Sequence, residues 1–532
     1  MGGFLKNVSL VGGFTLLSRL LGLGRDVLFF ACFGSSVAGS AFVLAFTLPN
    51  LFRRMLGEGT LSSAFIPVFS DTVEKQSLPA GLSLLNKVLS RLSLLLVVIL
   101  ACGVGLAFCA RSLDWVELPK WRLGLDLCAV TLPYVLFICL SAIVVGALNA
   151  RRRFGPGAYS PILLNLVTIG TLAYAGLSRG MEGEDLALVL CVAVLLGGVL
   201  QLIAPVITLC CEGSWRPKFD LAGSPEVSRV SQLFVVGAFG AAVAQVNVLV
   251  SRVLGYSLPD DGAVSFLYLS SRLVELPLGL FAIAIATVVF PEMANLLAKD
   301  DKAGFRSAFV KGMRLTLAMT LPAAAGLAVL AEPILAGLFR WGRFGAGEVE
   351  AVAPILALAA TGLPFYAAAG LYVRGFHARK DMKTPLRAAL VSLAANVALS
   401  LSLMFTWGAA GLVAANSLAA LVQTLYLWSR WRKAPDAVPS DQNVLSGEGI
   451  PRFHFSAILG ATVLMTLVVW GGGHLFESLR PAEEAFGKAH AWICLAVLIP
   501  AGVTVHFLAL GLFGFPEVAA VLRKLRPWVL GK

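Results

Sequence analysis

Apolar residues follow one another in long stretches along this chain. A transmembrane helix needs about 20 mostly apolar residues at a rise of 1.5 Å per residue, and by this measure the pattern predicts about fourteen such helices. The uncharged run 388–429 is about twice the needed length and is interrupted at Trp407-Gly408, so we expect a helical hairpin there. The predicted spans are 8–32, 36–56, 90–110, 126–150, 158–178, 186–211, 230–256, 263–293, 313–336, 351–376, 386–406, 409–430, 454–476 and 489–514.

Composition agrees with this pattern. Of the 532 residues, 58% are hydrophobic and 14% are charged, and the mean hydropathy is +0.84. Soluble globular proteins lie far from these values, so we expect an all-α polytopic membrane protein. Residues 1–8 carry one lysine and lack a short apolar region followed by a small-residue cleavage site, so no removable signal peptide is predicted.

The net charge of +12 comes largely from alternate loops. If the N-terminus is cytoplasmic, the basic groups at 53–54, 151–153, 379–383 and 523–526 share the cytoplasmic side, whereas the opposite side holds acidic loops such as 182–185. This is the positive-inside pattern. The charge therefore predicts topology, with both termini cytoplasmic, and contact with anionic lipids; it does not favour nucleic-acid binding.

The two halves of the chain resemble each other at an offset of about 225 residues, which indicates an internal repeat. VGGFTLLS from Val11 matches VGAFGAAV from Val236, and the basic turn GALNARRRFGPGAYSP at 146–161 matches GFHARKDMKTP at 375–385. We predict two parallel six-helix lobes with a cavity between them at mid-membrane. The predicted parts are an N-terminal lobe at 1–215, a second lobe at 225–433, a cytoplasmic linker at 434–453, and two extra helices with a basic tail at 454–532.

Charged residues inside the first span need an explanation, because charge in a membrane is costly and usually functional. In LLSRLLGLGRDVLFF, Ser18 and Arg25 are predicted on one helical face, and Arg19 and Asp26 on the adjoining one. The repeat position that answers Arg19 is Ala244, so the charge belongs to one lobe.

Further arginines lie near the predicted cavity. Arg272 and Glu275 are three residues apart in the eighth span, and Arg53, Arg54 and Glu58 close the second. An arginine excess in a cavity suits phosphate or diphosphate oxygens, which guanidinium groups bind in a forked geometry. The alternative is that Arg25 with Asp26 and Arg272 with Glu275 are buried ion pairs that join helices, and that Arg53 and Arg54 anchor the membrane edge.

No metal site or cofactor is predicted. The nine cysteines include no CxxC pair, and the five histidines show no HExxH or paired spacing. A phosphate-binding GxxxxGK[ST] motif is also missing from the sequence, so ATP hydrolysis by this chain is not expected to supply energy. A membrane potential acting on bound charge is a plausible source.

The stretch SRLLGLGRDVLFFACFGSSVAGSAFVLAFTLPNLFRRMLGEGTLSSAFIPVFS, with SSRLVELPLGLF and GFHARKDMKTP farther on, closely resembles the MurJ (MviN) lipid II flippases of the multidrug/oligosaccharidyl-lipid/polysaccharide exporter superfamily. The resemblance covers essentially the whole chain. It implies two six-helix lobes, two extra helices beside a lipid-accessible groove, and a location in the bacterial inner membrane. It also implies substrate-binding roles for Arg19, Arg25, Arg53 and Arg272, with Ser18, Asp26, Glu58 and Glu275 in support.

Three positions depart from the family pattern. Ser40 replaces an acidic residue, Thr47 replaces a frequent lysine, and Ser271 replaces an aspartate before Arg272. The seventh span also lacks the acidic residues of a cation site found in some members, so sodium coupling does not carry over to this chain.

The resulting hypothesis is a flippase that moves lipid II to the outer leaflet by alternating access as a monomer. Two alternatives keep the fold: export of another polyprenyl-diphosphate oligosaccharide, and cation-coupled drug antiport, which would favour carboxylates over arginines in the cavity. A membrane-embedded glycosyltransferase would need a catalytic carboxylate or histidine in a sizeable loop, and the outer loops are short. The hypothesis is therefore a transporter, not an enzyme.

Overall fold

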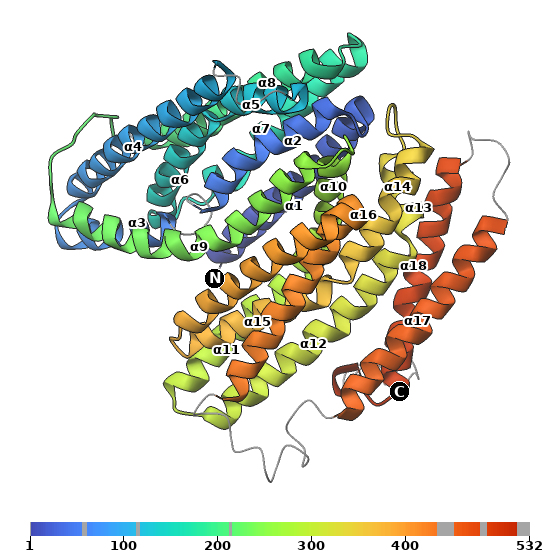
Figure 1. The fold of residues 1–532 in the computed structure, drawn as a ribbon. Coiled ribbons are helices and arrows are strands. Elements are labelled where there is room, and N and C mark those ends of the chain that lie inside the picture. The colour runs from blue at the N-terminus through green and yellow to red at the C-terminus, as the bar shows by residue number, and fades with distance from the viewer. Residues whose placement is uncertain are drawn as a thin grey trace. The chain divides into compact units, whose positions relative to one another are not determined.

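A computed structural model describes residues 2–55, 61–112, 118–211, 215–433, 452–478 and 487–518. Within these ranges every regular element is helical, which confirms the predicted all-α class (Figure 1). Ten helices in the described ranges are long and apolar enough to span a membrane, so the chain is a multi-pass membrane protein. The number fourteen stays a prediction.

The chain forms two compact units. Unit 1 consists of Met1–Ser265 with Trp341–Phe344, and unit 2 of Phe266–Arg340 with Gly345–Lys532. The lobe boundaries predicted from the repeat stay a prediction.

Among its described residues, unit 1 is built from nine α-helices, the π-helical segment η2 and a π-helical turn at 53–55. α7 packs against both α1 and α8, and α2 packs against α5 and α9. A break at Leu132 and Pro133 separates α5 from α6, because proline cannot donate the backbone hydrogen bond that a continuing helix needs. The elements are α1 (Gly2–Phe33), α2 (Val37–Phe52), α3 (Leu61–Lys75), α4 (Leu78–Ser112), α5 (Pro119–Thr131), α6 (Tyr134–Ala150), α7 (Gly155–Thr171), the π-helix η2 (Leu172–Ser178), α8 (Gly183–Cys211) and α9 (Pro225–Ser257).

Unit 2 contains the remaining helices, with α10 beginning at the border of unit 1. Its core includes an aromatic cluster in which the rings of Phe309 and Trp431 stack at 4.1 Å, with Phe305 and Phe376 around them. Dispersion between such rings adds to the burial of their apolar area. The elements are α10 (Ala263–Pro277), the π-helix η3 (Leu278–Ile283), α11 (Ala284–Ala298), α12 (Lys302–Val329), α13 (Ala331–Phe339), α14 (Ala346–Ala360), α15 (Leu363–Ala378), α16 (Lys383–Arg432), α17 (Arg452–Ser478) and α18 (Gly487–Leu512).

α16 is the predicted hairpin. Gly408 has φ 54° and ψ −130°, a conformation that interrupts the helix and that glycine adopts without steric cost. On the two sides of this break the Ser392 hydroxyl donates to the Ala419 carbonyl at 3.2 Å. Residues 27 positions apart meet only if the helix folds back on itself, which confirms the hairpin.

The two basic turns that the repeat aligns end their helices in the same way. Arg152 and Lys380 both have φ 61°, in the left-handed region. The Arg153 amide donates to the Leu148 carbonyl at 2.9 Å, and the Asp381 amide donates to the Phe376 carbonyl at 3.0 Å. Both are Schellman-type helix ends, which satisfy carbonyls that the last turn would otherwise leave without partners.

Candidate functional site

The polar residues of α1 lie in two different environments. Arg19 is exposed, whereas Asp26 is buried with 1% of its surface accessible. From Val11 to Leu20 most residues of the helix are exposed, and near Gly22 the helix enters the core of unit 1. Arg19 and Asp26 share a helical face two turns apart, as expected, but only Asp26 lies inside the protein.

Arg25 is ion-paired to its neighbour in the chain. Its Nη2 lies 2.7 Å from Asp26 Oδ1, and its Nε donates to the same oxygen at 3.1 Å. A buried carboxylate needs such a partner, because desolvation of an isolated charge costs several kcal/mol. The structure therefore contains the ion pair that the alternative interpretation of Arg25 expects.

Asn165 on α7 joins this pair to the rest of α1. Its Oδ1 accepts from Arg25 Nη1 at 3.4 Å, and its Nδ2 donates to the Ser18 carbonyl at 3.1 Å. Asn165 is 6% exposed, so its amide makes these bonds within the core. Asn165 is not among the residues predicted from the sequence. An asparagine in the predicted span 158–178 was the available signal, since polar residues inside membrane spans are uncommon and usually face protein.

Arg53 lies at the C-terminal end of α2, where its Nε donates to Asn50 Oδ1 at 2.9 Å. Residues 53–55 form a π-helical turn. Arg54 is also partly exposed. Glu58 lies outside the described residues, so its relation to these arginines is not part of the structure.

Arg272 and Glu275 belong to unit 2. Arg272 Nη1 lies 3.7 Å from Glu275 Oε2, with 30% and 42% of the two side chains exposed. The residues precede η3, so this cluster, like Arg53, adjoins a π-helical segment. Turns of this kind occur frequently at functional sites.

The three residues that depart from the family pattern all make neutral hydrogen bonds. Thr47 donates to the Val43 carbonyl of its own helix, and Ser271 donates to the Leu267 carbonyl. The Ser40 hydroxyl lies 3.2 Å from that of Ser265, a residue 225 positions later, which is the offset of the repeat. These side chains therefore add no charge near the arginines.

Comparison with solved structures defines the fold class: the chain has an all-helical membrane-protein fold that it shares with the two structures described next. A structure described as "Lipid II flippase MurJ, inward closed conformation" matches with a TM-score of 0.77 at 24% identity, over 96% of this chain and 99% of that one. An inward-facing multidrug resistance MATE transporter of the MOP superfamily matches with a TM-score of 0.65 at 13% identity, over 80% and 96%.

Sequence comparison identifies the family. The family model "Lipid II flippase MurJ" matches residues 29–485. A protein of Rhizobium meliloti named "Probable lipid II flippase MurJ" is 32% identical over 96% of this chain and 94% of its own length. A Bdellovibrio bacteriovorus protein of the same name is also 32% identical, over 84% and 87%. The chain belongs to the MurJ lipid II flippase family, as the sequence resemblance predicted.

Proposed function

We propose that this protein moves lipid II, the lipid-linked peptidoglycan precursor, from the cytoplasmic to the outer leaflet of the bacterial inner membrane. Membership in the flippase family supports the substrate and the transport class. The observation that carries the chemical part of the proposal is that Arg19 is exposed on α1, the helix that the sequence predicts as the first membrane span. An exposed arginine at membrane depth attracts an anionic group, and lipid II offers a diphosphate.

Arg25 has a different part in this proposal. Asp26 and Asn165 hold its side chain, so its direction is set before any substrate arrives. Its Nε and Nη2 donate to one Asp26 oxygen and its Nη1 donates to Asn165, which fixes the plane of the guanidinium group. Arg25 would therefore act as an oriented anion ligand, at a lower ordering cost than a flexible side chain.

Arg53 and Arg272 complete the proposed diphosphate-binding set. Asn50 orients Arg53, and Glu275 lies near Arg272 at a separation that suits a weak, partly exposed pair. A diphosphate brings more negative charge than one carboxylate, so it would compete with Glu275 for the Arg272 guanidinium.

Transport itself would follow an alternating-access cycle. The two lobes would open in turn toward each side of the membrane, so that the polar head group never crosses the hydrocarbon layer. The basic cytoplasmic turns would keep both termini inside and contact anionic lipids. The protein would act as a monomer.

Complementation tests the proposal. A bacterium depleted of its lipid II flippase would receive the wild-type chain, Arg19→Ala, Arg272→Ala, or the control Arg179→Ala at matched membrane levels. Arg179 is an exposed arginine whose guanidinium contacts Tyr174. We expect rescue by the wild type and the control, and failure of the other two. Rescue by Arg19→Ala would contradict the anion site, and failure of a well-expressed wild type would point to another polyprenyl-diphosphate cargo.

A further inference from the structure

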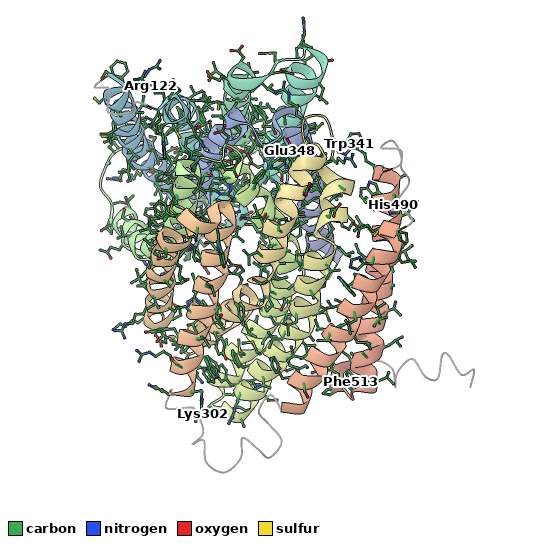
Figure 2. All side chains as sticks on the ribbon, turned by 45° about the vertical axis from the view of Figure 1, so that its right-hand side comes forward. Arg122, Lys302, Trp341, Glu348, His490 and Phe513 are labelled. Atoms are coloured by element: carbon green, nitrogen blue, oxygen red, sulfur yellow. The ribbon has the colours of Figure 1, made fainter. Side chains whose placement is uncertain are left out.

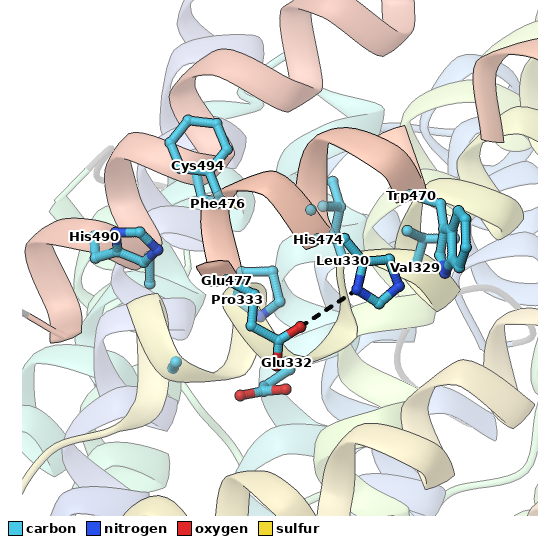
Figure 3. A pocket seen from close by; sticks show the side chains of 13 residues that line it. Val329, Leu330, Glu332, Pro333, Trp470, His474, Phe476, Glu477, His490 and Cys494 are labelled. Atoms are coloured by element: carbon cyan, nitrogen blue, oxygen red, sulfur yellow. Dashed lines mark ion pairs between the residues drawn. The ribbon is translucent and has the colours of Figure 1, made fainter. Parts of the chain in front are cut away.

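A second candidate site lies within unit 2, where α17 and α18 pack beside the end of α12 and the start of α13 (Figure 3). The pocket has a volume of about 240 Å³, which is enough for a small polar head group. The pocket lies at the end of α12 opposite to the turns that the sequence predicts to be cytoplasmic. α12 begins at Lys302, next to such a turn, and ends at Val329, which lines the pocket. Figure 2 shows Lys302 and Phe513 at one end of unit 2 and His490 toward the other.

The polar lining of this pocket is acidic. Glu332 comes from α13 and Glu477 from α17, and the described lining residues include no lysine or arginine. His474 and His490 are the other titratable nitrogen groups of the lining, and His474 Nδ1 lies 3.6 Å from Glu477 Oε2. Such a lining repels phosphate and attracts a cation, in contrast to the arginines proposed for the diphosphate.

Aromatic and apolar groups make up the rest of the wall. The Trp470 ring packs edge-on against His474 at 4.4 Å between centroids, and Phe476 packs against His490 at 5.7 Å. Leu330 and Cys494 also line the pocket and belong to a buried apolar cluster with Met465, Val469, Leu495 and Leu498. A ligand that fits must therefore combine a cationic group with an apolar body, since aromatic faces also attract cations.

The level of the pocket relative to the membrane limits which ligands can reach it. Trp470 and Trp492 are 55% and 50% exposed and belong to the same ends of α17 and α18. Exposed tryptophans concentrate at the level of the lipid head groups. If the basic turns are cytoplasmic, as the sequence predicts, this end of unit 2 faces the outer leaflet.

We propose that this pocket binds a primary ammonium group, held between the carboxylates of Glu332 and Glu477 and the Trp470 ring. A metal ion is a poor alternative, because the described residues contain no cluster of three or more His, Cys, Asp or Glu side chains able to hold one. Two sources carry the required chemistry: the ethanolamine head group of an outer-leaflet phospholipid, whose acyl chains would lie along α17 and α18, and a soluble polyamine.

Native mass spectrometry of the full chain in detergent tests this site. The probes are an ethanolamine phospholipid, a glycerol phospholipid with the same acyl chains, and spermidine. The variants are Glu332→Gln, Glu477→Gln and the control Glu350→Gln, which removes an exposed carboxylate from α14 of the same unit. Thermal unfolding of each variant verifies that its fold is intact.

We expect each lining variant to weaken ammonium binding about tenfold, the loss that corresponds to one charge-assisted hydrogen bond, and the control to leave it unchanged. Glutamate-dependent binding of the ethanolamine lipid, with weaker binding of the glycerol lipid, assigns the site to the lipid. Glutamate-dependent binding of spermidine alone assigns it to a soluble amine. Binding of both probes that is unchanged in the two lining variants, or a preference for the glycerol lipid, would overturn the proposal.

Discussion

Arg25 and Asp26 provide a test that separates a role in transport from a role in holding the fold. The variants are Arg25→Gln, Asp26→Asn and the combination of the two. Removing one partner of a buried ion pair costs about 3–5 kcal/mol, because the other charge stays in the interior, whereas removing both leaves no such charge. Asp26 is 1% exposed and the Arg25 side chain is 17% exposed, so the two single substitutions should lower the free energy of unfolding by different amounts.

Arg25→Gln removes the ion-pair partner of the more deeply buried group, so the loss in free energy of unfolding should be about 4 kcal/mol, within the range for a broken buried pair. Asp26→Asn leaves an arginine that is partly exposed and still bonded to Asn165, so a smaller loss of about 2 kcal/mol is expected. The free energy of unfolding of the double variant should lie within about 1 kcal/mol of the wild-type value. Thermal unfolding of the purified proteins measures the order of stability of the three variants.

Complementation then gives the functional result. The double variant should reach the membrane at normal levels and still fail to rescue a flippase-depleted strain, since it lacks the proposed anion ligand. If the double variant restores growth while Arg25→Gln does not, Arg25 serves only to balance Asp26, and the diphosphate proposal loses this residue. Equal stability of the two single variants would refute the burial argument itself.

Three further predictions concern the framework. Gly408→Ala should lower the free energy of unfolding by about 1–2 kcal/mol, because Gly408 has a positive φ. Gly370→Ala, at a helical position where an added Cβ meets no other atom, should leave the free energy of unfolding unchanged or raise it, and thermal unfolding measures both variants. Asn86→Ala removes the oxygen that accepts the hydrogen bond of the Trp215 indole at 2.8 Å, so limited proteolysis should cut the segment 215–222 faster. Ser83→Ala, at an exposed position of α4, is the control and should leave the rate of cleavage unchanged. Asp381→Asn should lower the melting temperature at pH 7. Burial acts to raise the pKa of Asp381, but hydrogen bonds from Thr384 and the Lys383 amide lower it by more, so the folded-state pKa lies below the unfolded-state value of about 3.9. The stabilisation by Asp381 is therefore present above the unfolded-state pKa and is lost as pH falls through the lower folded-state pKa. A wild-type-like melting temperature of Asp381→Asn at pH 7 would contradict that assignment.

Local features of the structure could be predicted well from the sequence. The hairpin break at Gly408 follows from a run too long for one span and from a glycine within it. The Arg25–Asp26 pair follows from adjacency, because neighbouring side chains need no knowledge of the fold to meet. The internal repeat aligns the basic turns at 151–153 and 379–381 from their sequences alone, and the two turns have the same positive φ and the same backbone hydrogen bond.

Contacts between distant segments could not be predicted in the same way. Asn165 meets Ser18 and Arg25 across about 140 residues, and only the packing of α7 on α1 brings them together. The pocket around Glu332 likewise needs four helices, α12 and α13 from one part of the chain and α17 and α18 from another, so its acidic lining has no signature in any one segment. The change from exposed residues at 11–20 to buried residues after Gly22 in α1 also depends on the neighbouring helices, since the residues before and after this point are similarly apolar.

The π-helical segments beside Arg53 and Arg272 give each cluster a mechanical property. A π turn accommodates one more residue than an α turn over the same rise, and one residue corresponds to about 100° of rotation around the helix axis. If such a turn relaxed into α-helical geometry or moved along the chain, the side chains on one side of it would swing by that angle relative to those on the other. Arg53 and Arg272 could thus change the direction in which they point without any change in the tilt of α2 or α10.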